Sequence, residues 1–231
     1  MRIVVLSGAG LSAESGIETF RAADGLWENH SVDAVATREG FTADPKLVHK
    51  FYNDRRRQLK EVKPNAAHYA LAKLETMPGI ELFHVTQNID DLCERAGATN
   101  LVHMHGELLK CRCLRCAKII QWERDVSIRI ACPECGFKSE WGGIRPHIVW
   151  FGEMPLYMKE IEDALSNCDL FVAVGTSGLV YPAANFVQMV KSAKAKTLLL
   201  NKDPAANNRL FDDVIVGKAS EVVPQWVESL A

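Results

Sequence analysis

The sequence predicts an α/β fold, a doubly wound parallel sheet with a smaller lobe attached to it. Six short apolar runs recur along the 231 residues, and helical patterns lie between several of them. Runs that are almost continuously apolar are typical of strands buried on both faces of a parallel sheet. Strands that alternate with helices predict a doubly wound sheet with helices on both faces.

The predicted strands cover residues 3–6, 81–86, 101–104, 170–174, 197–200 and 214–216. The predicted helices cover residues 65–74, which follow Pro64, and residues 160–165 and 183–192. Two segments, about 22–63 and about 110–144, fit neither pattern. We interpret them as insertions that form the smaller lobe.

The composition excludes several classes of protein. Hydrophobic residues make up 48% of the chain and charged residues 24%, which is typical of a soluble globular enzyme. A net charge of −2 argues against a nucleic-acid partner. The apolar runs are too short to span a bilayer or to serve as a signal-peptide core, so we expect no membrane partner. Four of the seven cysteines lie in C-x-x-C pairs, which indicates metal binding in a reducing compartment and predicts a cytoplasmic protein.

A glycine-rich turn directly follows the first predicted strand. Gly8, Gly10 and Ala13 satisfy the pattern G-x-G-x-x-G/A, which is typical of turns that hold the pyrophosphate of a dinucleotide. Glycines there let backbone N–H groups approach phosphate, and the helix expected to follow presents its positive end. A tight strand-to-helix turn without a ligand stays open as the alternative.

The residues after this turn do not fit a dehydrogenase. In such an enzyme a second strand ends in an acidic residue about 20 positions on. Residues 20–27 instead read FRAADGLW, a loop with a glycine and no β-rich run. The sequence therefore predicts a bound dinucleotide without the layout for hydride transfer.

Two cysteine pairs predict a metal site. Cys113 and Cys116 form the first C-x-x-C pair, and Cys132 and Cys135 form the second after 15 intervening residues. This spacing predicts a tetrahedral Cys₄ zinc site, because each pair places two thiolates on one side of a turn. No histidine or carboxylate completes an open position, so we expect a structural zinc. A redox dithiol and unrelated core cysteines remain alternatives, and Cys111 is a competing ligand through its C-x-C spacing.

The sequence resembles the sirtuin family over almost its whole length. It contains, in the family's order, GAGLSAESGIETFR at 8–21, TQNID at 86–90, HGE at 105–107, the two C-x-x-C pairs, RPHIVWFGE at 145–153, GTS at 175–177 and NKD at 201–203. Sirtuins are NAD-dependent protein lysine deacylases. The chain is most similar to the compact bacterial branch, close to the class III type associated with negatively charged acyl groups.

The resemblance implies the activity. An NAD-dependent protein-lysine deacylase removes the acyl group, here acetyl and succinyl, and releases nicotinamide and O-acyl-ADP-ribose. NAD would therefore be consumed as a co-substrate, and acylated lysine side chains of proteins would be the other partner. His105 matches the family's general base, because Gly-Glu follows it, and an imidazole has a suitable pKa for that role. We expect the neighbouring His103 to be a buried, hydrogen-bonded core histidine.

The resemblance also implies three domains and a cofactor site. The domains are a Rossmann-like NAD-binding lobe of residues 1–21, 64–109 and 145–231, a cofactor loop with an inserted helical module at 22–63, and a zinc-binding module at 110–144. The residues expected to contact NAD are Gly8, Ala9, Gly10, Phe20, Arg21, Trp27, Gln87, Asn88, Ile89, Asp90, Gly175, Thr176, Ser177, Asn201, Asp203 and Ala219. Several of them follow predicted strands, where α/β sheets bind ligands.

A second stretch, residues 51–57, bears on the acyl group. At ~100° per residue, Val48, Tyr52, Arg55 and Leu59 fall within a narrow arc of a helix, whereas Arg57 points to the opposite side. An arginine in an apolar stripe needs an anion, and its guanidinium can bind a carboxylate by two parallel hydrogen bonds. A solvated basic face and an internal salt bridge stay open as alternatives.

By resemblance, Tyr52 and Arg55 match the Tyr-x-x-Arg pair that reads the carboxylate of succinyl-lysine. Ala36 matches a small residue that leaves room for the longer acyl chain. Val149, Phe151 and Gly152 match the segment that pairs with the substrate backbone as an added strand, although IVWF also fits an ordinary core strand.

Two other functions stay open. A plain deacetylase or a mono-ADP-ribosyltransferase on the same fold shares the chemistry and differs in the acyl group or the nucleophile. A non-catalytic sensor of NAD or ADP-ribose is the second alternative. A sensor has no need of His105, Asn88 and Asp90 together, so their presence favours an enzyme.

Overall fold

The computed structural model of the protein describes residues 1–18, 26–27, 30–203 and 205–230. Its larger lobe is built on a six-stranded sheet whose order is β11-β10-β9-β1-β4-β5, with every neighbouring pair parallel. The strands are β1 (Arg2–Ser7), β4 (Glu81–Thr86), β5 (Leu101–His103), β9 (Leu170–Val174), β10 (Lys196–Asn201) and β11 (Asp213–Val216). The prediction of a doubly wound parallel sheet is confirmed, and the six predicted strands agree with these to within one residue at each end.

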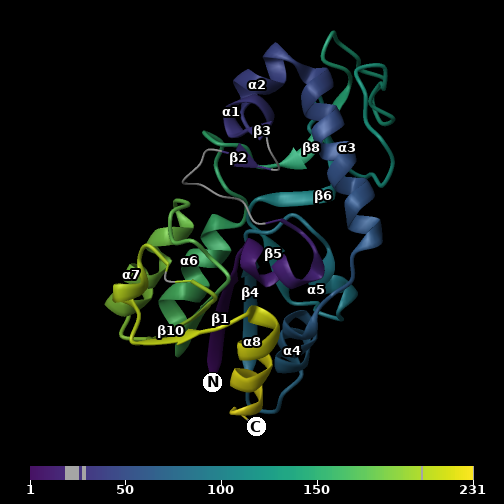
Figure 1. The fold of residues 1–231 in the computed structure, drawn as a ribbon. Coiled ribbons are helices and arrows are strands. Elements are labelled where there is room, and N and C mark those ends of the chain that lie inside the picture. Colours follow the sequence, from purple (N-terminus) through teal and green to yellow (C-terminus); the bar gives the residue numbers. More distant parts are fainter. Residues whose placement is uncertain (19–25, 28–29, 204, 231) are drawn as a thin grey trace.

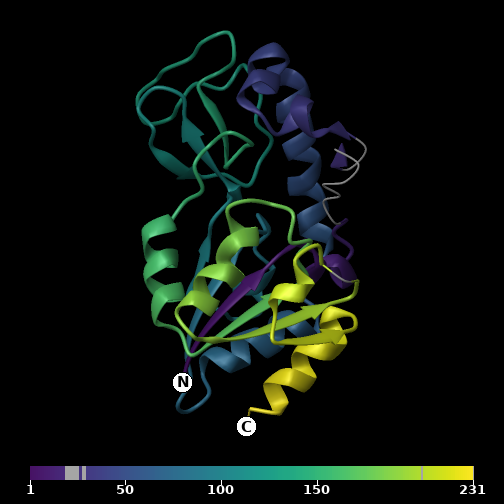
Figure 2. The same ribbon diagram turned by 90° about the vertical axis from the view of Figure 1, so that its left-hand side faces the viewer.

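Helices cover both faces of this sheet (Figures 1 and 2). Side chains that alternate along β1 explain the two layers, since Ile3 and Val5 face one core and Val4 and Leu6 face the other. The first core is covered by α4 (Ala66–Glu75) and α8 (Ala219–Glu228), and the second by α6 (Met158–Asn167) and α7 (Phe186–Ser192).

The sequence sets where the long helices begin. α4 follows Pro64, and its N-cap Asn65 accepts a hydrogen bond from the N–H of Ala67. α3 (Pro45–Glu61) starts with a proline at its first position, after Asp44, whose side chain accepts from the N–H of Leu47. Strong caps of this kind fix the register of each helix and hence which of its side chains face inward.

The smaller lobe lies beyond the carboxyl ends of the parallel strands (Figure 1). It combines a helical part with an antiparallel sheet of order β7-β6-β8. Its helices are α1 (Val32–Val35), α2 (Arg38–Ala43) and α3, and its strands are β2 (Leu26–Trp27), β3 (His30–Ser31), β6 (Gly106–Cys113), β7 (Ile119–Gln121) and β8 (Ile144–Ile148). The prediction of a second, smaller lobe is confirmed.

The two lobes join where candidate catalytic residues lie. β5 of the large sheet ends at His103, and β6 of the small sheet begins at Gly106. The short helix α5 (Leu92–Arg95) follows the loop after β4, and Leu92 packs into the core of the small lobe. None of the helices in the described part of the chain combines the length and apolar composition needed to cross a bilayer.

Candidate active site

The carboxyl ends of the parallel strands carry most of the residues predicted to bind NAD. Ser7 at the end of β1 is in register with both Thr86 of β4 and Val174 of β9. The chain continues from β1 toward one edge through β4 and later toward the other through β9, so the strand order reverses at β1. Open α/β sheets bind ligands outside the strand ends at such a point.

The glycine-rich turn after β1 packs against the loop after β9. The N–H of Gly8 donates to the carbonyl of Val174, and the N–H of Gly10 donates to that of Gly175, each at 2.9 Å. A Cβ added to Gly10 would lie 2.6 Å from the Cα of Gly175. Glycine is therefore required for the contact between the two loops, and these two amides are already bonded within the protein.

The expectation that a helix follows this turn is wrong. Within residues 1–18, Ala9–Leu11 and Ala13–Ser15 form two short 3₁₀ turns, and Gly16 ends the second with φ +96°. The side chain of Ser12, between the two turns, bonds toward the interior of the site. A helix dipole therefore does not contribute at this turn, and binding of a phosphate would depend on individual amides and side chains.

Ser12 connects three residues of the site. Its buried hydroxyl donates to Asp90 Oδ2 at 3.0 Å and accepts from Asn88 Nδ2 at 3.2 Å. It also lies 3.3 Å from His68 Nε2. His68 Nδ1 accepts from the N–H of Asn65, so the ring carries its proton on Nε2 and donates to Ser12. Asn88 and His68 therefore donate to Ser12, and Ser12 donates to the carboxylate of Asp90.

Burial raises the pKa of Asp90 to about 6, although bonds from the N–H of Leu92 and from Ser12 lower it in part. Burial also lowers the pKa of His68 to about 4, so this ring is neutral at neutral pH. Asp90 is thus an ionised group held among neutral donors, and it is poised to accept further hydrogen bonds from a ligand.

The two histidines around the lobe junction have different surroundings. Half-buried His105 donates from Nδ1 to the carbonyl of Gln87 at 3.2 Å, which leaves the lone pair of the neutral ring on Nε2. Burial lowers its pKa below the usual value, while that carbonyl bond raises it in part. A neutral imidazole with a defined basic nitrogen is suited to general-base catalysis.

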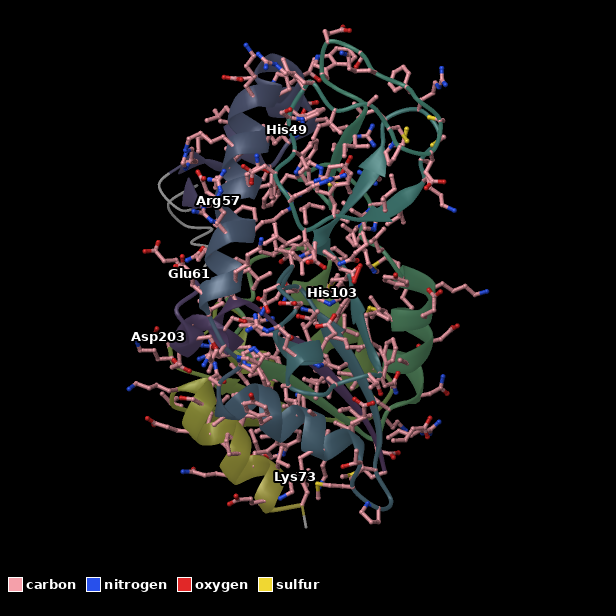
Figure 3. All side chains as sticks on the ribbon, turned by 90° about the vertical axis from the view of Figure 1, so that its right-hand side faces the viewer. His49, Arg57, Glu61, Lys73, His103 and Asp203 are labelled. Atoms are coloured by element: carbon pink, nitrogen blue, oxygen red, sulfur yellow. The ribbon has the colours of Figure 1, made fainter. Side chains whose placement is uncertain are left out.

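His103 is bonded on both sides. Its Nδ1 lies 2.9 Å from the carbonyl of Asn88, and its Nε2 lies 2.8 Å from Glu94 Oε1. Burial lowers the pKa of His103, but the bond and charge of Glu94 outweigh burial and raise it overall. Figure 3 shows this side chain at the junction of the two lobes. The expectation of a buried, hydrogen-bonded histidine is confirmed by these contacts.

The loops after β9 and β10 lie beside the same strand ends. Thr176 Oγ1 accepts from Gln87 Nε2 at 3.3 Å, and the carbonyl of Thr176 accepts from Asn201 Nδ2 at 3.0 Å. Asn201 also donates to the carbonyl of Asp203 at 2.8 Å, which orders the loop after β10. Four other residues predicted to contact NAD also lie near these strand ends in the chain. Ala9 follows β1, Ile89 follows β4, Ser177 follows β9, and Ala219 is the first residue of α8.

Three predicted cofactor residues come from the segment after the first turn. Phe20 and Arg21 lie outside the described residues. Trp27 lies in the small lobe, where its ring makes edge-to-face contacts with Phe51 and Tyr52 at centroid distances of 5.0 and 6.0 Å. The structure therefore places Trp27 beside Tyr52, which is predicted to bind the acyl group.

Tyr52 and Arg55 lie one turn apart on α3. Tyr52 is completely buried, and its hydroxyl oxygen accepts from Trp150 Nε1 at 2.9 Å. Arg55 is half-buried and places its guanidinium carbon 4.9 Å from the centroid of the Phe51 ring. Ala36 is buried in the same core of the small lobe.

The expected placement of arginines on α3 is correct only in part. Arg57 is exposed, as expected, and pairs with Asp54 and Asp125. The arginine that is almost wholly buried is Arg56, at 1% exposure, because it lies four residues after Tyr52 on the inward face. Its guanidinium donates to the carbonyl of Leu108 at 3.0 Å, to Asn53 Oδ1 at 2.9 Å and to Cys111 Sγ at 3.6 Å.

The segment expected to pair with substrate runs between the base and the helical part. The N–H of Val149 donates to the carbonyl of His105 at 2.8 Å, and the N–H of Phe151 donates to that of Ala36 at 2.9 Å. Phe151 is exposed, and Gly152 has φ +82° with open space around the position of a Cβ. This backbone is therefore anchored at two points and reaches the surface at its end.

Four cysteine side chains meet in the small lobe. The Sγ atoms of Cys113, Cys116, Cys132 and Cys135 all lie within 4.8 Å of one another. Cys113 Sγ accepts from the N–H groups of Arg115 and Cys116, each at 3.3 Å, as expected for a thiolate on a turn. This donor set suits a structural zinc, and the predicted cysteine cluster is confirmed.

Cys111 lies outside that cluster. It is completely buried, contacts Arg56, and has a pKa raised by burial to about 11. Its Sγ is not in the group of four that lie within 4.8 Å of one another, so the geometry favours Cys113 over Cys111 as the ligand from this strand.

With this geometry established, comparison with known proteins identifies the family. The sequence pattern that defines the Sir2 family matches residues 8–182. The chain belongs to the Sir2 family. It is 56% identical over 229 residues to the NAD-dependent protein deacylase of Pasteurella multocida, which covers 98% of this chain and 97% of that protein. It is also 56% identical over 231 residues to the NAD-dependent protein deacylase of Escherichia coli K12, covering 99% and 82% of the two chains.

Solved Sir2 structures share the fold. A Sir2 homologue in complex with NAD is 36% identical, with a TM-score of 0.89 and coverage of 99% of this chain and 89% of that one. A Sir2 protein bound to a myristoylated histone peptide is 33% identical, with a TM-score of 0.76 and coverage of 99% and 90%. The sirtuin resemblance of the sequence is thereby confirmed, together with NAD as the expected co-substrate.

Sequence reasoning missed four residues of this Sir2 site. Ser12 and His68 organise Asp90 and Asn88, and Trp150 and Arg56 hold the inner face of α3. A serine in a loop and a histidine in an amphipathic helix have no pattern of their own. Arg56 did have one, since its spacing from Tyr52 places it on the buried stripe.

Proposed function

We propose that this protein removes both succinyl and acetyl groups from lysine side chains of proteins and releases nicotinamide and O-acyl-ADP-ribose. It is an NAD-dependent protein deacylase, as its family and its 56% identity to such enzymes over nearly the whole chain establish. The acyl range and the role of each residue are our proposal. The cysteine cluster requires reduced thiols to bind zinc, which supports a cytoplasmic location.

We assign a separate role to each predicted part of the chain. Within residues 1–21, 64–109 and 145–231, the lobe with the parallel sheet binds NAD, which supplies the ribose carbon from which nicotinamide leaves and to which the acyl oxygen bonds. Asn88 can donate and accept, and ionised Asp90 can accept, at the ribose and the nicotinamide amide. Ser12 holds both side chains in place. The loop that contains Gly175–Ser177 and the loop that contains Asn201 bind the phosphates and the adenosine of NAD.

His105 is the proposed base for the ribose hydroxyls. Its bond to the carbonyl of Gln87 fixes the proton on Nδ1, so Nε2 is the atom that accepts a proton from the hydroxyl. The N–H of Val149 donates to the carbonyl of His105, which supports a position beside the base for an acyl-lysine held by that segment. Residues 22–63 then supply the groups that meet the end of the acyl chain.

One observation carries the succinyl assignment. α3 brings a phenol and a guanidinium, Tyr52 and Arg55, to one side of a helix within an aromatic cluster of the small lobe. A dicarboxylic acyl chain ends in a carboxylate, which a guanidinium binds more strongly than any neutral partner does. An acetyl group is shorter and neutral, so these residues do not exclude it.

The experiment compares Arg55→Met with Arg57→Met on one peptide that carries succinyl-lysine or acetyl-lysine. Loss of one partner of a buried charge pair costs about 2–5 kcal/mol, so Arg55→Met should lower kcat/KM for desuccinylation by tens- to thousands-fold. Deacetylation should change much less. Arg57 is exposed on the same helix, so Arg57→Met is a matched control that should leave both reactions unchanged.

A plain deacetylase is the alternative that this experiment separates. If Arg55→Met leaves the ratio of the two kcat/KM values unchanged, the succinyl assignment fails and deacetylation is the better description. A mono-ADP-ribosyltransferase would release nicotinamide and label a protein acceptor without loss of an acyl group, which mass spectrometry of the peptide distinguishes.

A further inference from the structure

Trp150 is buried behind the residues proposed to read the acyl group. Only 2% of it is exposed, and its indole N–H donates to the hydroxyl of Tyr52 at 2.9 Å. The two residues are 98 positions apart in the chain, so this bond joins α3 to the end of β8. Trp150 follows β8 by two residues, and its backbone N–H and its indole N–H are both bonded within the protein.

The bond determines what Tyr52 can do. An indole nitrogen only donates, so the phenol must use its oxygen as the acceptor, and its own hydrogen is left to donate elsewhere. Burial raises the pKa of Tyr52 above its usual value, so the phenol keeps that hydrogen. A phenol that accepts from one partner also becomes a better donor to the next. Tyr52 is therefore oriented as a hydrogen-bond donor.

The indole is itself held in place from two directions. The guanidinium carbon of Arg145 lies 3.3 Å from the ring centroid of Trp150, and Phe41 contacts the indole at a centroid distance of 5.2 Å. Glu153 binds Arg145 through two bonds of 2.7 and 3.0 Å and also accepts from the N–H of Trp150 at 3.0 Å. Arg112 and Arg38 bind the same carboxylate, so it is fixed by three guanidinium groups.

We propose that Trp150 is a specificity-determining positioning residue, whose indole N–H fixes the Tyr52 hydroxyl as a donor to the carboxylate of an acidic acyl chain. The inference rests on the proposed function, because it assigns a task to Tyr52 that only a substrate with a terminal acceptor uses. An acetyl group ends in a methyl and offers no acceptor to that hydroxyl. Trp150 should therefore affect desuccinylation and not deacetylation.

The first test is Trp150→Phe, which keeps an aromatic ring and removes the donor. One peptide is assayed with succinyl-lysine and with acetyl-lysine. We expect kcat/KM for desuccinylation to fall about three- to tenfold, the range that the net free energy of one hydrogen bond supports. The change should lie mainly in KM, and kcat/KM for deacetylation should fall by less than about twofold. Equal losses for both substrates would overturn the proposal.

The second test asks whether Trp150 acts through Tyr52. In a double-mutant cycle, Trp150→Phe is introduced into the Tyr52→Phe protein, which has no hydroxyl to orient. The effect of Trp150→Phe on the ratio of the two kcat/KM values should then disappear. A purely structural role of Trp150 would lower both reactions in both backgrounds. A succinyl-specific effect that persists in the Tyr52→Phe protein would mean that Trp150 does not act through Tyr52, and it would also overturn the proposal.

A ring of different size in the core can prevent folding, so a second replacement keeps the shape. With 3-benzothienylalanine in place of Trp150, sulfur replaces the N–H while the bicyclic ring remains. This variant should reproduce the loss of desuccinylation, and full retention of that activity contradicts the proposal.

Arg55→Met separates the two failures. If Arg55→Met leaves the substrate ratio unchanged, the succinyl assignment itself fails. If Arg55→Met changes the ratio and the Trp150 replacements do not, the succinyl assignment stands and only the role of Trp150 is wrong.

Discussion

Two buried carboxylates on opposite sides of the site have opposite pKa shifts. Asp90, on the side of the large lobe, is 8% exposed, and burial raises its pKa to about 6. The side chain of Glu153, in the small lobe, is 5% exposed, and its pKa is lowered to about 2. Burial acts in the same direction on both. For Glu153, however, the bonds and charge of Arg145, with help from Arg38, outweigh it.

The difference shows that burial alone does not tell which buried charge stabilises the fold. Among the described residues, Asp90 receives its hydrogen bonds from two neutral groups, Ser12 and the N–H of Leu92, so its charge is costly in the folded state. Glu153 is compensated by guanidinium groups and holds β6, β8 and α2 together. A costly ionised group beside strand ends is typical of a ligand site, whereas a compensated one is typical of a structural clamp.

The largest expected effect concerns the four-cysteine cluster of the small lobe. Cys132→Ala removes one of four thiolates, and structural zinc sites supply about 10–16 kcal/mol of apparent binding free energy. We expect loss of stoichiometric zinc by metal analysis and unfolding of the zinc-binding module by thermal melting. The large lobe, with its own two cores, should keep its parallel sheet.

Cys111→Ser is the matched control for Cys132→Ala. Cys111 is buried nearby, but its thiol contacts Arg56 and is not in the group of four Sγ atoms, so zinc should be retained in full. Release of zinc by Cys111→Ser would show that the first cysteine pair is assigned in the wrong register. Full stability of Cys132→Ala without zinc would show that the lobe does not depend on the metal.

The second prediction concerns His105 and His103, the two histidines at the junction with the large lobe. His105→Ala should lower turnover by about 10²–10⁴-fold, as expected for loss of a general base, while NAD still binds. His103→Ala removes a ring bonded to Asn88 and Glu94 and should lower stability more than turnover. Single-turnover kinetics and thermal melting of both variants measure the two effects. Equal turnover losses in two folded proteins would leave no reason to prefer His105.

The sequence could predict the features that depend on pattern and spacing. Buried parallel strands are continuous apolar runs, and two C-x-x-C pairs specify four ligands regardless of the fold around them. Sheet topology then places the loops after β1, β4, β9 and β10 together. Family resemblance added His105 and the Tyr52–Arg55 pair, whose roles composition and spacing alone do not specify.

The sequence could not predict contacts that form only in three dimensions. The bond from Trp150 to Tyr52 joins the segment after β8 to the insertion at 22–63, and the partners of Ser12 come from the loop after β4 and from α4. The helix expected after Gly10 is replaced by 3₁₀ turns because Gly8 and Gly10 pack tightly against Gly175. Tertiary contact outweighs local propensity at each of these positions.

The third prediction tests the structural role of Glu153. Glu153→Gln keeps the size of the side chain and removes the charge that compensates three arginines. Breaking a buried ion pair costs about 3–5 kcal/mol, because Arg145 is left buried without its partner. We expect a loss of this size in the free energy of unfolding by urea at pH 7. An Arg38→Gln control removes only the most exposed of the three arginines and should cost less than about 1 kcal/mol.

The pH dependence of the Glu153 effect has a definite sign. A carboxyl group whose pKa is lowered on folding stabilises the protein above its unfolded value, which is about 4.3. This contribution is lost as the pH falls toward the folded value of about 2. The wild-type protein and Glu153→Gln should therefore converge in stability below about pH 4, and a constant difference across that range would contradict the ion-pair account.

The last prediction reverses the sign for Asp90. A carboxyl group whose pKa is raised on folding stabilises the protein below its unfolded value, about 3.9, and this contribution is lost as the pH rises through the folded value of about 6. A shift of about two pKa units corresponds to roughly 3 kcal/mol. Asp90→Asn cannot ionise, and its amide oxygen can still accept from the N–H of Leu92. The variant should therefore be up to about 3 kcal/mol more stable than wild type at pH 7, with no such gain at pH 4, in urea unfolding. Its turnover should fall, because the acceptor kept for the ligand is weakened. If Asp90→Asn is less stable than wild type at both pH values, Asp90 is a structural clamp like Glu153, and the contrast between the two sides of the site is wrong.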